Sequence, residues 1–348
     1  MKIQFAFFIT LFSLPLFGQT PSYYNDVNLN LTGLNLKQEL AQKIVSTHNN
    51  TLSYGQVWNV LKEADSNPIN SNNVLLLYGW NDTDTDITND LNRNIEDNGG
   101  NTGDWNREHT YAKSLGTPAL GTSGPGADAH NLRASDVQRN GSRGNKKFGE
   151  ATLGTPSGTV GTFWFPGNEW RGDVARILMY MYLRYGDQCK PSNVTIGNPV
   201  SVDLNMVDLL LTWNAIDQPD AFEDHRNEII QQNQGNRNPF IDNPYLATII
   251  WGGNTAQNRW NLTLKKTALA SYILYPNPTK NKHFTISNLS VNYNHQLTLL
   301  NMLGEVVFTI KSDYKNNISI DLPELPKGNY LLRVNSNNTI FHKKILLL

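Results

Sequence analysis

The chain has 348 residues, with 29 Lys and Arg against 30 Asp and Glu, a net charge of −1 and a hydrophobic fraction of 39%. This length allows two domains that each bury a core, and a charge near zero argues neither for nor against a nucleic-acid partner. The single cysteine, Cys189, excludes a framework of disulfides within the chain. We interpret it as a buried structural thiol and not as a catalytic group.

The amino terminus has the pattern of a secretory signal peptide. Lys2 precedes an apolar run over residues 3–17 that is too short and too early for a membrane anchor. We expect residues 1–19 to be removed on export. No later segment of the sequence is apolar enough to span a bilayer, which predicts no stable membrane insertion.

The first hundred residues predict helices, one strand and one loop. Residues 23–72 are expected to be mostly helical, because leucine, isoleucine and valine recur at steps of three and four. Residues 74–80 form a short apolar run typical of a buried strand. Residues 81–103 are rich in Asp, Asn and Thr but lack the Gly and Glu positions of an EF-hand, so we interpret them as a polar surface loop.

Three polar motifs follow at Trp105–His109, Asp128–Leu132 and Asn140–Asn145. A histidine can take a proton near neutral pH, and here His109 stands beside the hard oxygen ligand Glu108, which suits magnesium. If Trp105–His109 is a strand, these two side chains point to opposite faces. Residues 106–147 carry seven Lys and Arg against three Asp and Glu, whereas residues 20–269 carry 20 against 26. This positive island suggests a substrate that carries phosphate.

Phosphodiester cleavage requires a base for water, a cation for the developing charge and groups that bind phosphate. His109 is the candidate base, and Glu108 with the amide oxygen of Asn140 is the candidate pair of metal ligands. The candidate phosphate-binding residues are basic: Arg107, Arg143, Lys146 and Lys147. The residues expected to give structural support are Trp105 as an anchor, His130 as an orienting histidine and Asn131 as a brace.

The remaining segments predict a strand, three helices and then a change of domain. A strand is expected at residues 162–166, helices at 170–185, 202–214 and 219–234, and an extended segment at 235–242. Residues 254–271 are polar and loosely patterned, as in a linker. Beyond them, short apolar strands separated by Asn, Gly and Pro predict an all-β sandwich over residues 272–348.

The three motifs, with Arg226-Asn227 and residues 234–239, resemble bacterial endonuclease I over Tyr23 to Trp251. The resemblance implies an α+β fold: a mostly helical nuclease domain, residues 20–253, built round a ββα-metal (His-Me) finger and followed by the small β-sandwich. It implies a monomer that cuts DNA, and often RNA, with little sequence preference and leaves 5′-phosphate ends. It also implies that His109 is the base and that Glu108 and Asn140 hold Mg²⁺, with Mn²⁺ as a substitute and Ca²⁺ as a further candidate.

Two features depart from that family. Its periplasmic members carry several disulfides, which one cysteine cannot form. They also place a phosphate-binding arginine in the loop after the histidine strand, whereas residues 115–127 contain no arginine. Arg143 is the expected substitute.

The carboxy-terminal part resembles the sorting domain of the type IX secretion system, on residues 274–278, 301–305 and 325–330. This resemblance implies interaction with the type IX machinery, passage through the outer membrane, and a secreted or cell-surface protein.

Two other functions remain open from the residues alone. A non-catalytic surface protein could bind nucleic acid or glycan through Trp164, Trp170 and Trp213. A zinc hydrolase is disfavoured, because the sequence has neither an HExxH motif nor a Cys/His cluster.

Overall fold

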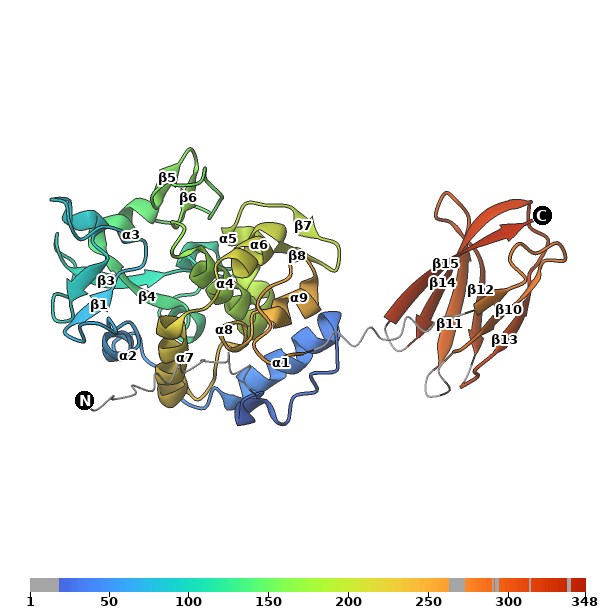
Figure 1. The fold of residues 1–348 in the computed structure, drawn as a ribbon, viewed down its shortest axis with the longest axis horizontal. Helices are drawn as coiled ribbons and strands as arrows, with labels where there is room; N and C mark the ends of the chain where they lie inside the picture. The colour runs from blue at the N-terminus through green and yellow to red at the C-terminus, as the bar shows by residue number, and fades with distance from the viewer. Residues whose placement is uncertain (1–18, 263–272, 290, 292–293, 313, 337–338) are drawn as a thin grey trace, which may run out of the picture. The chain divides into compact units, whose positions relative to one another are not determined.

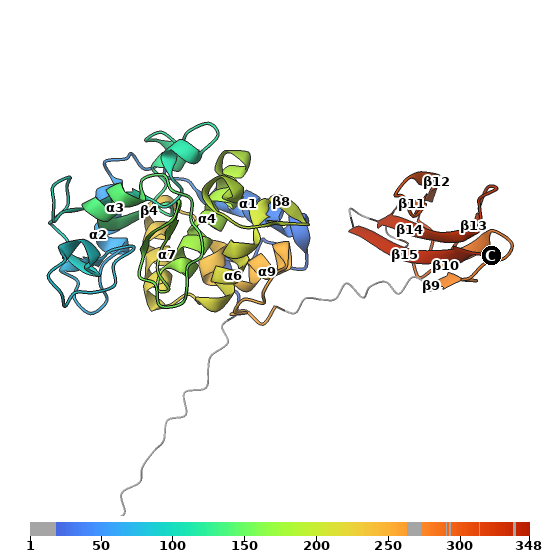
Figure 2. The same ribbon diagram turned by 90° about the horizontal axis from the view of Figure 1, so that it is seen from above.

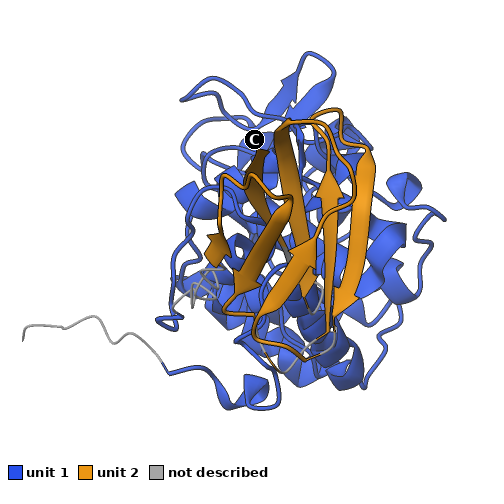
Figure 3. Cartoon of the chain, turned by 90° about the vertical axis from the view of Figure 1, so that its right-hand side faces the viewer, with its two compact units in different colours: residues 1–262 blue, residues 263–348 orange. Residues whose placement is uncertain are grey.

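The computed structural model describes residues 19–262, 273–289, 291, 294–312, 314–336 and 339–348. The chain divides into two compact units, residues 1–262 and residues 263–348 (Figure 3). Most of the expected signal peptide, residues 1–18, lies outside the described residues. Within the described ranges, none of the helices is both long and apolar enough to cross a membrane.

A nearly all-buried helix, α4 (Arg171–Tyr185), forms the centre of the first unit (Figure 1). Residues 172–183 of α4 are all buried, which is the pattern of a helix surrounded on every side. The helices that touch α4 are α1 (Gly33–Thr47), α5 (Pro191–Val194), α6 (Asp208–Ile216) and α8 (Pro239–Asp242). Helix α9 (Tyr245–Trp251) packs on α1, α6 and α8.

Two further helices enclose a smaller apolar cluster. They are α2 (Val57–Ala64) and α7 (Ala221–Gln234), which pack on each other. The Asp220 side chain caps the start of α7, and Gly235 ends it at φ 94°, a conformation that glycine adopts without strain. The cluster includes Trp105, Leu132 and Ala134, so these helices support the strands that carry the polar motifs.

The strands of the first unit form four antiparallel pairs. They are β1 (Asn73–Leu75) with β2 (Asn92–Asn94), β3 (Trp105–His109) with β4 (Leu132–Asp136), β5 (Gly158–Val160) with β6 (Phe163–Phe165), and β7 (Pro199–Val200) with β8 (Asp203–Val207). Helix α3 (Val137–Arg143) follows β4 directly and packs on both β3 and β4.

Three segments differ from the expectations. Residues 203–207 are strand β8, and helix α6 begins only at Asp208. The strand expected at residues 74–80 ends at Leu75. Tyr78 has φ 76°, which is outside the extended region that a strand requires. Gly79 follows in a tight place, where a Cβ would lie 2.1 Å from the Asp90 carbonyl oxygen. The segment expected to be extended ends in helix α8, because Asn238 caps it and a proline opens it.

A chain of buried charges connects the elements around β4. Arg133 on β4 contacts Asp65 at 3.1 Å and Asp173 at 3.0 Å, and Arg226 on α7 also binds Asp65. Arg176 on α4 extends the chain to Glu223 on α7 at 2.5 Å. These side chains are at most 9% exposed. Removal of one partner would leave an unpaired buried charge, which typically costs several kcal/mol.

The second unit is all-β, as the sequence predicts. One sheet has the strand order β13-β10-β9 and the other the order β12-β11-β14-β15, with every pair antiparallel. Their bounds are β9 Ile273–Tyr275, β10 His283–Ser287, β11 His295–Leu300, β12 Val306–Ser312, β13 Ile318–Asp321, β14 Gly328–Ser336 and β15 Thr339–Leu347. One apolar cluster with side chains from both sheets fills the space between them.

The beginning of the expected linker packs on the first unit. Trp260 is 9% exposed, and its ring centroid lies 4.8 Å from that of Tyr24. Arg259 pairs with Asp224 on α7 at 2.6 Å. The packed part of the first unit therefore includes the beginning of the expected linker, and residues 263–271 of that linker lie outside the described residues.

Candidate active site

Strand β3 presents its motif residues on two faces, as strand alternation requires. Asn106 and Glu108 face helix α3, where Asn106 contacts Asn140 and Glu108 contacts Arg143. Arg107 and His109 face the other way, toward Tyr54. The strand thus delivers a carboxylate and an imidazole to opposite sides of one short ribbon.

Although they leave opposite faces of β3, Glu108 and His109 both line one hollow of about 230 Å³ at the end of the strand. Its lining residues come from the end of β3, the turn after it and the end of α3: Glu108, His109, Ala112, Lys113, Ser114, Asn140, Arg143, Gly144 and Asn145. The structure therefore brings together four of the predicted residues, His109, Glu108, Asn140 and Arg143. The other predicted residues lie outside this lining.

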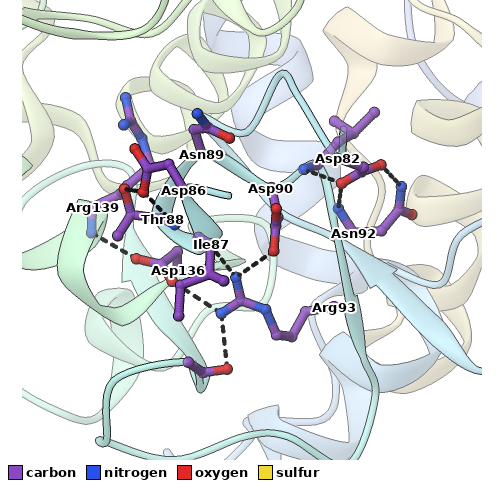
Figure 4. A network of polar contacts seen from close by, with 12 residues as sticks. Asp82, Asp86, Ile87, Thr88, Asn89, Asp90, Asn92, Arg93, Asp136 and Arg139 are labelled. Carbon is purple, nitrogen blue, oxygen red and sulfur yellow. Dashed lines mark hydrogen bonds and ion pairs between the residues drawn. The ribbon is translucent and has the colours of Figure 1, made fainter. Parts of the chain in front are cut away.

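Helix α3 is held in place by its first turn (Figure 4). The Asp136 carboxylate accepts hydrogen bonds from the backbone N–H groups of Gln138 at 2.8 Å and Arg139 at 3.0 Å. Its other oxygen accepts one from Arg93 on β2 at 2.9 Å, and the same guanidinium contacts Asp90 at 3.3 Å. The polar segment 81–103 is thus a support for α3, a role that its composition did not indicate.

Among the described residues, His109 has a hydrogen-bond partner at one ring nitrogen, Nε2, and none at Nδ1. Its Nε2 lies 2.9 Å from the Gly126 carbonyl oxygen, and because a carbonyl only accepts, Nε2–H is the donor. The pKa of His109 is lowered to about 4, mainly by burial and also by the charges of Lys113, Arg107 and Arg143, while the hydrogen bond to Gly126 opposes the shift. Nδ1 is left with its lone pair, ready to accept a proton. Gly126 is required here, because a Cβ would lie 2.2 Å from the Gly121 carbonyl oxygen.

Glu108 is a buried carboxylate with one oxygen engaged. Its Oε1 accepts from the Tyr78 hydroxyl at 2.9 Å and lies 3.1 Å from Arg143. Burial raises the pKa of Glu108, while the Arg143 guanidinium and the Tyr78 hydrogen bond oppose the rise. These contacts leave Oε2 as the oxygen available to a cation.

Asn140 is oriented in the same way. Its Nδ2 donates to Asn106 Oδ1 at 2.6 Å, which leaves Asn140 Oδ1 as an unused acceptor at the hollow. Asn106 was missed by sequence reasoning, although its position two residues before Glu108 on a strand places both on the same face.

Arg143, a candidate phosphate-binding residue, is bound by other groups of the protein. It is fully buried, and it donates to the backbone oxygens of His109 at 2.9 Å and Thr110 at 2.8 Å in addition to its pairing with Glu108. A guanidinium engaged in this way cannot turn to a substrate without leaving Glu108 unpaired. Its observed contacts are those of a group that fixes the site.

The other predicted cations lie around the site. The guanidinium of Arg107 stacks 3.5 Å from the Tyr54 ring centroid and 4.2 Å from that of Trp58. Lys147 donates to the Ser192 carbonyl at 2.9 Å, and Lys146 donates to the Ser142 carbonyl at 2.5 Å. Lys113, which sequence reasoning counted but assigned no role, is exposed, lines the hollow and pairs with no carboxylate among the described residues.

The supporting residues of the motifs are buried. Trp105 is fully buried against Trp58, with ring centroids 5.1 Å apart. Asn131 accepts from the Tyr111 N–H at 2.7 Å, and its own carbonyl accepts from Thr110 N–H at 3.0 Å. These hydrogen bonds brace the turn that follows His109.

His130 lies away from the hollow, in a buried polar network. Its ring centroid is 4.3 Å from that of Tyr180, and burial lowers the pKa of His130 to about 4. The hub of the network is Asp128, which accepts from Tyr180 and Tyr185 hydroxyls at 2.8 Å each. This network holds the turn that presents Gly126 to His109.

Tyr54 is the residue that sequence reasoning had no signal to find. Its ring stacks on His109 with centroids 5.5 Å apart and an interplanar angle of 26°. It arrives from the segment before α2, far from the motifs in sequence. Lys113 lies 5.8 Å above the same ring, so Tyr54 joins the imidazole to both nearby cations.

Several alternative sites do not form. Trp164, Trp170 and Trp213 are 2%, 4% and 0% exposed, so they do not make the open stacking surface that a non-catalytic binding protein would need. Cys189 is buried, and burial raises the pKa of its thiol, which disfavours a catalytic thiolate. In the part of the chain that the structure describes, no group of three or more His, Cys, Asp and Glu could hold a metal, so a zinc site of that kind is absent there.

The contacts of Arg143 predict the effect of its removal. Arg143→Gln should lower the free energy of unfolding by about 3 kcal/mol, because Glu108 would lose its partner inside the protein. Lys147→Gln, at an exposed cation just beyond the same helix, should change it by less than about 0.5 kcal/mol. Urea unfolding of both variants measures the difference. Equal, small losses would show that Arg143 does not hold the site together.

Comparisons with known proteins match the two parts of the chain to two different families. The family profile for Endonuclease I matches residues 32–245, and the profile for a secretion system C-terminal sorting domain matches residues 273–347. The chain is 43% identical over 244 residues to an extracellular ribonuclease of Bacillus amyloliquefaciens, covering 67% of this chain and 79% of that protein. It is 45% identical over 245 residues to an extracellular ribonuclease of Bacillus subtilis (strain 168), covering 68% and 80%.

The two matched regions coincide with the two units of the structure, and the first contains the hollow with its histidine, carboxylate and asparagine. The sorting domain and the extracellular relatives make the protein secreted or cell-surface. The chain belongs to the endonuclease I family of nucleases and ends in a secretion system sorting domain.

Proposed function

We propose that this nuclease hydrolyses the phosphodiester bonds of DNA and RNA with His109 as general base and one divalent ion held by Glu108 and Asn140. The observation that carries the proposal is the convergence of an imidazole with a free Nδ1, a carboxylate and an amide oxygen on one hollow. The order β3-β4-α3, with ligands on strand and helix, supports a ββα-metal (His-Me) finger.

The base step requires His109 to be neutral before it meets a water molecule. Its low pKa meets this requirement at every pH above about 4. Nδ1 takes the proton from the attacking water, while Nε2–H stays donated to the Gly126 carbonyl and keeps the ring in place. The tautomer is thus fixed by the protein and needs no rearrangement during the reaction.

The donor set fits a small, hard divalent ion. Glu108 Oε2 and Asn140 Oδ1 are two oxygens at one hollow, and few protein ligands suit Mg²⁺, which keeps several waters and shares its substrate's phosphate oxygens. Members of the endonuclease I family are generally dependent on a divalent metal. When bound, the ion would neutralise charge that develops on the phosphate and on the departing oxygen. Mn²⁺ should substitute, and Ca²⁺ is a weaker candidate.

Lys113 is the residue that we propose binds the scissile phosphate in place of Arg143. It follows the histidine strand, its side chain is exposed at the hollow, and no carboxylate in the described residues neutralises it. Arg107, Lys146 and Lys147 lie outside the lining, where they would contact flanking phosphates. Substrate cleavage is expected to have little sequence preference and to leave 5′-phosphate ends. RNA is included because the two relatives are named as ribonucleases.

The role of His109 predicts both a loss of rate and a pH profile. His109→Ala should lower kcat at least about a hundredfold, as removal of a general base does. In the unaltered protein, the imidazole accepts a proton only when it is deprotonated. The rate should therefore rise with pH through about 4 and level off well below the ordinary histidine value of 6.5.

The control for this test is His225→Ala, since His225 is exposed on α7 and bonds the Glu63 carbonyl at 3.1 Å. Plasmid nicking and RNA cleavage by all three proteins, measured from pH 3.5 to pH 8, would supply the comparison. An unchanged rate for His109→Ala would remove this residue from the mechanism, and an acid limb near 6.5 would contradict a buried neutral imidazole.

The metal site predicts a graded response at Asn140. EDTA should abolish cleavage, and Mg²⁺ or Mn²⁺ should restore it. Asn140→Ala loses an oxygen and should need a far higher Mg²⁺ concentration or lose activity, whereas Asn140→Asp keeps an oxygen and should retain more. Cleavage measured against Mg²⁺ concentration separates the three proteins. Superimposable curves would show that Asn140 is not a ligand.

A further inference from the structure

A second hollow, of about 460 Å³, lies beside helix α3 and apart from the active-site lining. It is formed by the segment after β1, the loop before β5 and the loop between β6 and α4: Gly79, Trp80, Gly154, Thr155, Pro156, Ser157, Pro166, Gly167, Asn168, Glu169 and Trp170. Figure 1 shows the β5–β6 pair next to α3, which contacts β5. The size and the mixture of aromatic and polar walls are those of a small-molecule site.

Trp80 gives this hollow an open aromatic surface. Trp80 is 40% exposed, and the other seven tryptophans, which also lie within residues 19–262, are less exposed. Two contacts nevertheless hold this residue. The backbone N–H of Trp80 donates to the Asn89 carbonyl at 2.8 Å, and the Arg139 guanidinium lies 4.3 Å from the centroid of the indole ring. A fixed, exposed indole is suited to stacking against a flat ring.

A second tryptophan in the lining is hydrogen-bonded to the segment that carries Trp80. Trp170 is buried, and its Nε1 donates to the Gly79 carbonyl at 2.8 Å. Gly79, next to Trp80, has no room for a Cβ, because one would lie 2.1 Å from the Asp90 carbonyl oxygen. The Trp170 hydrogen bond thus ties the segment that carries Trp80 to the start of α4, and a hollow held in this way loses less entropy when a ligand binds.

Glu169 places an exposed carboxylate at this hollow. Its carboxylate has no hydrogen bond or ion pair within residues 19–262, and partial burial raises its pKa. A carboxylate repels phosphate but accepts N–H groups, as Asp and Glu do from cytosine N4. Among the bases, guanine offers two adjacent N–H donors on its pairing edge, whereas thymine and uracil offer one between two carbonyls.

Helix α3 connects this hollow to the active site. Arg139, which holds Trp80 and donates to the Ser157 hydroxyl at 2.7 Å, is the neighbour of the proposed metal ligand Asn140. The two side chains leave the same helical turn in different directions, one toward each hollow. A nucleic-acid strand at the active site would therefore have a base-sized hollow within reach.

We propose that this second hollow binds one unpaired base of a single-stranded nucleic acid, stacked on Trp80 and hydrogen-bonded to Glu169, with guanine preferred. The proposal rests on the function given above only in that the ligand is the nuclease's own substrate. A paired base cannot enter, so the hollow favours single strands over duplexes.

The test measures binding without cleavage. Fluorescein-labelled single-stranded octamers, all thymidine or with one central guanosine, are titrated with the full mature chain in EDTA and followed by anisotropy. Trp80→Ala should weaken binding of the guanosine octamer at least about fivefold, as loss of one stacked base does. Trp80→Phe, which keeps a ring, should recover most of that loss, and Leu204→Ala, a distant exposed residue, should bind like the parent.

Glu169→Gln should remove most of the difference between the two octamers while leaving the all-thymidine octamer unchanged. In the presence of Mg²⁺, Trp80→Ala should raise KM for single strands, with kcat and duplex cleavage unchanged.

Unchanged octamer binding by a folded Trp80→Ala protein would overturn the proposal and leave the nuclease function intact. Trp80-dependent binding of a neutral oligosaccharide, but not of the octamers, would also overturn it, in favour of a glycan site. Conversely, Trp80-dependent octamer binding by a chain that cleaves nothing would count against the proposed function and not against the subsite.

Discussion

The guanidinium of Arg143 is the link on which the geometry of the active site depends. It reaches from α3 to β3, donates to the backbone oxygens of His109 and Thr110, and pairs with Glu108. Because these groups are buried, the ionic bond offsets the desolvation of both charges, and neither can leave without a large cost. The same contact fixes the distance between the strand with His109 and the helix with Asn140. Because these contacts engage Arg143 with the protein, we propose Lys113 as the residue that binds substrate phosphate in its place.

In each of the three side chains, the protein engages one polar atom and leaves a second one available. The Gly126 carbonyl accepts from His109 Nε2–H, Asn106 Oδ1 accepts from Asn140 Nδ2, and Glu108 Oε1 accepts from Tyr78 and pairs with Arg143. The atoms left available are Nδ1 of His109, Oδ1 of Asn140 and Oε2 of Glu108. Partners of this kind set tautomer and orientation before substrate arrives, so the protein bears the cost of ordering the site during folding and not during the reaction.

The sequence predicted the parts of this arrangement that follow from local rules. Strand alternation correctly placed Glu108 and His109 on opposite faces, and helical spacing found α4 and α7. It did not reveal Tyr54 or Gly126, because their contacts with His109 depend on how distant segments pack. The helix expected at residues 202–214 failed at its start, where a short pairing with β7 overrides an apolar pattern. Burial of Arg143 was also hidden, since a basic residue in a polar motif resembles a surface group until the fold encloses it.

The central claim is that His109 is neutral and presents a free Nδ1 to the hollow. Nitrogen-15 NMR of the histidine side chains, with His109 assigned by comparison with His109→Ala, tests it directly. At pH 7 the account predicts a protonated Nε2 and an unprotonated Nδ1 for His109, persisting as the pH is lowered to about 5. A doubly protonated ring at pH 7, or a proton on Nδ1 in place of Nε2, would contradict it.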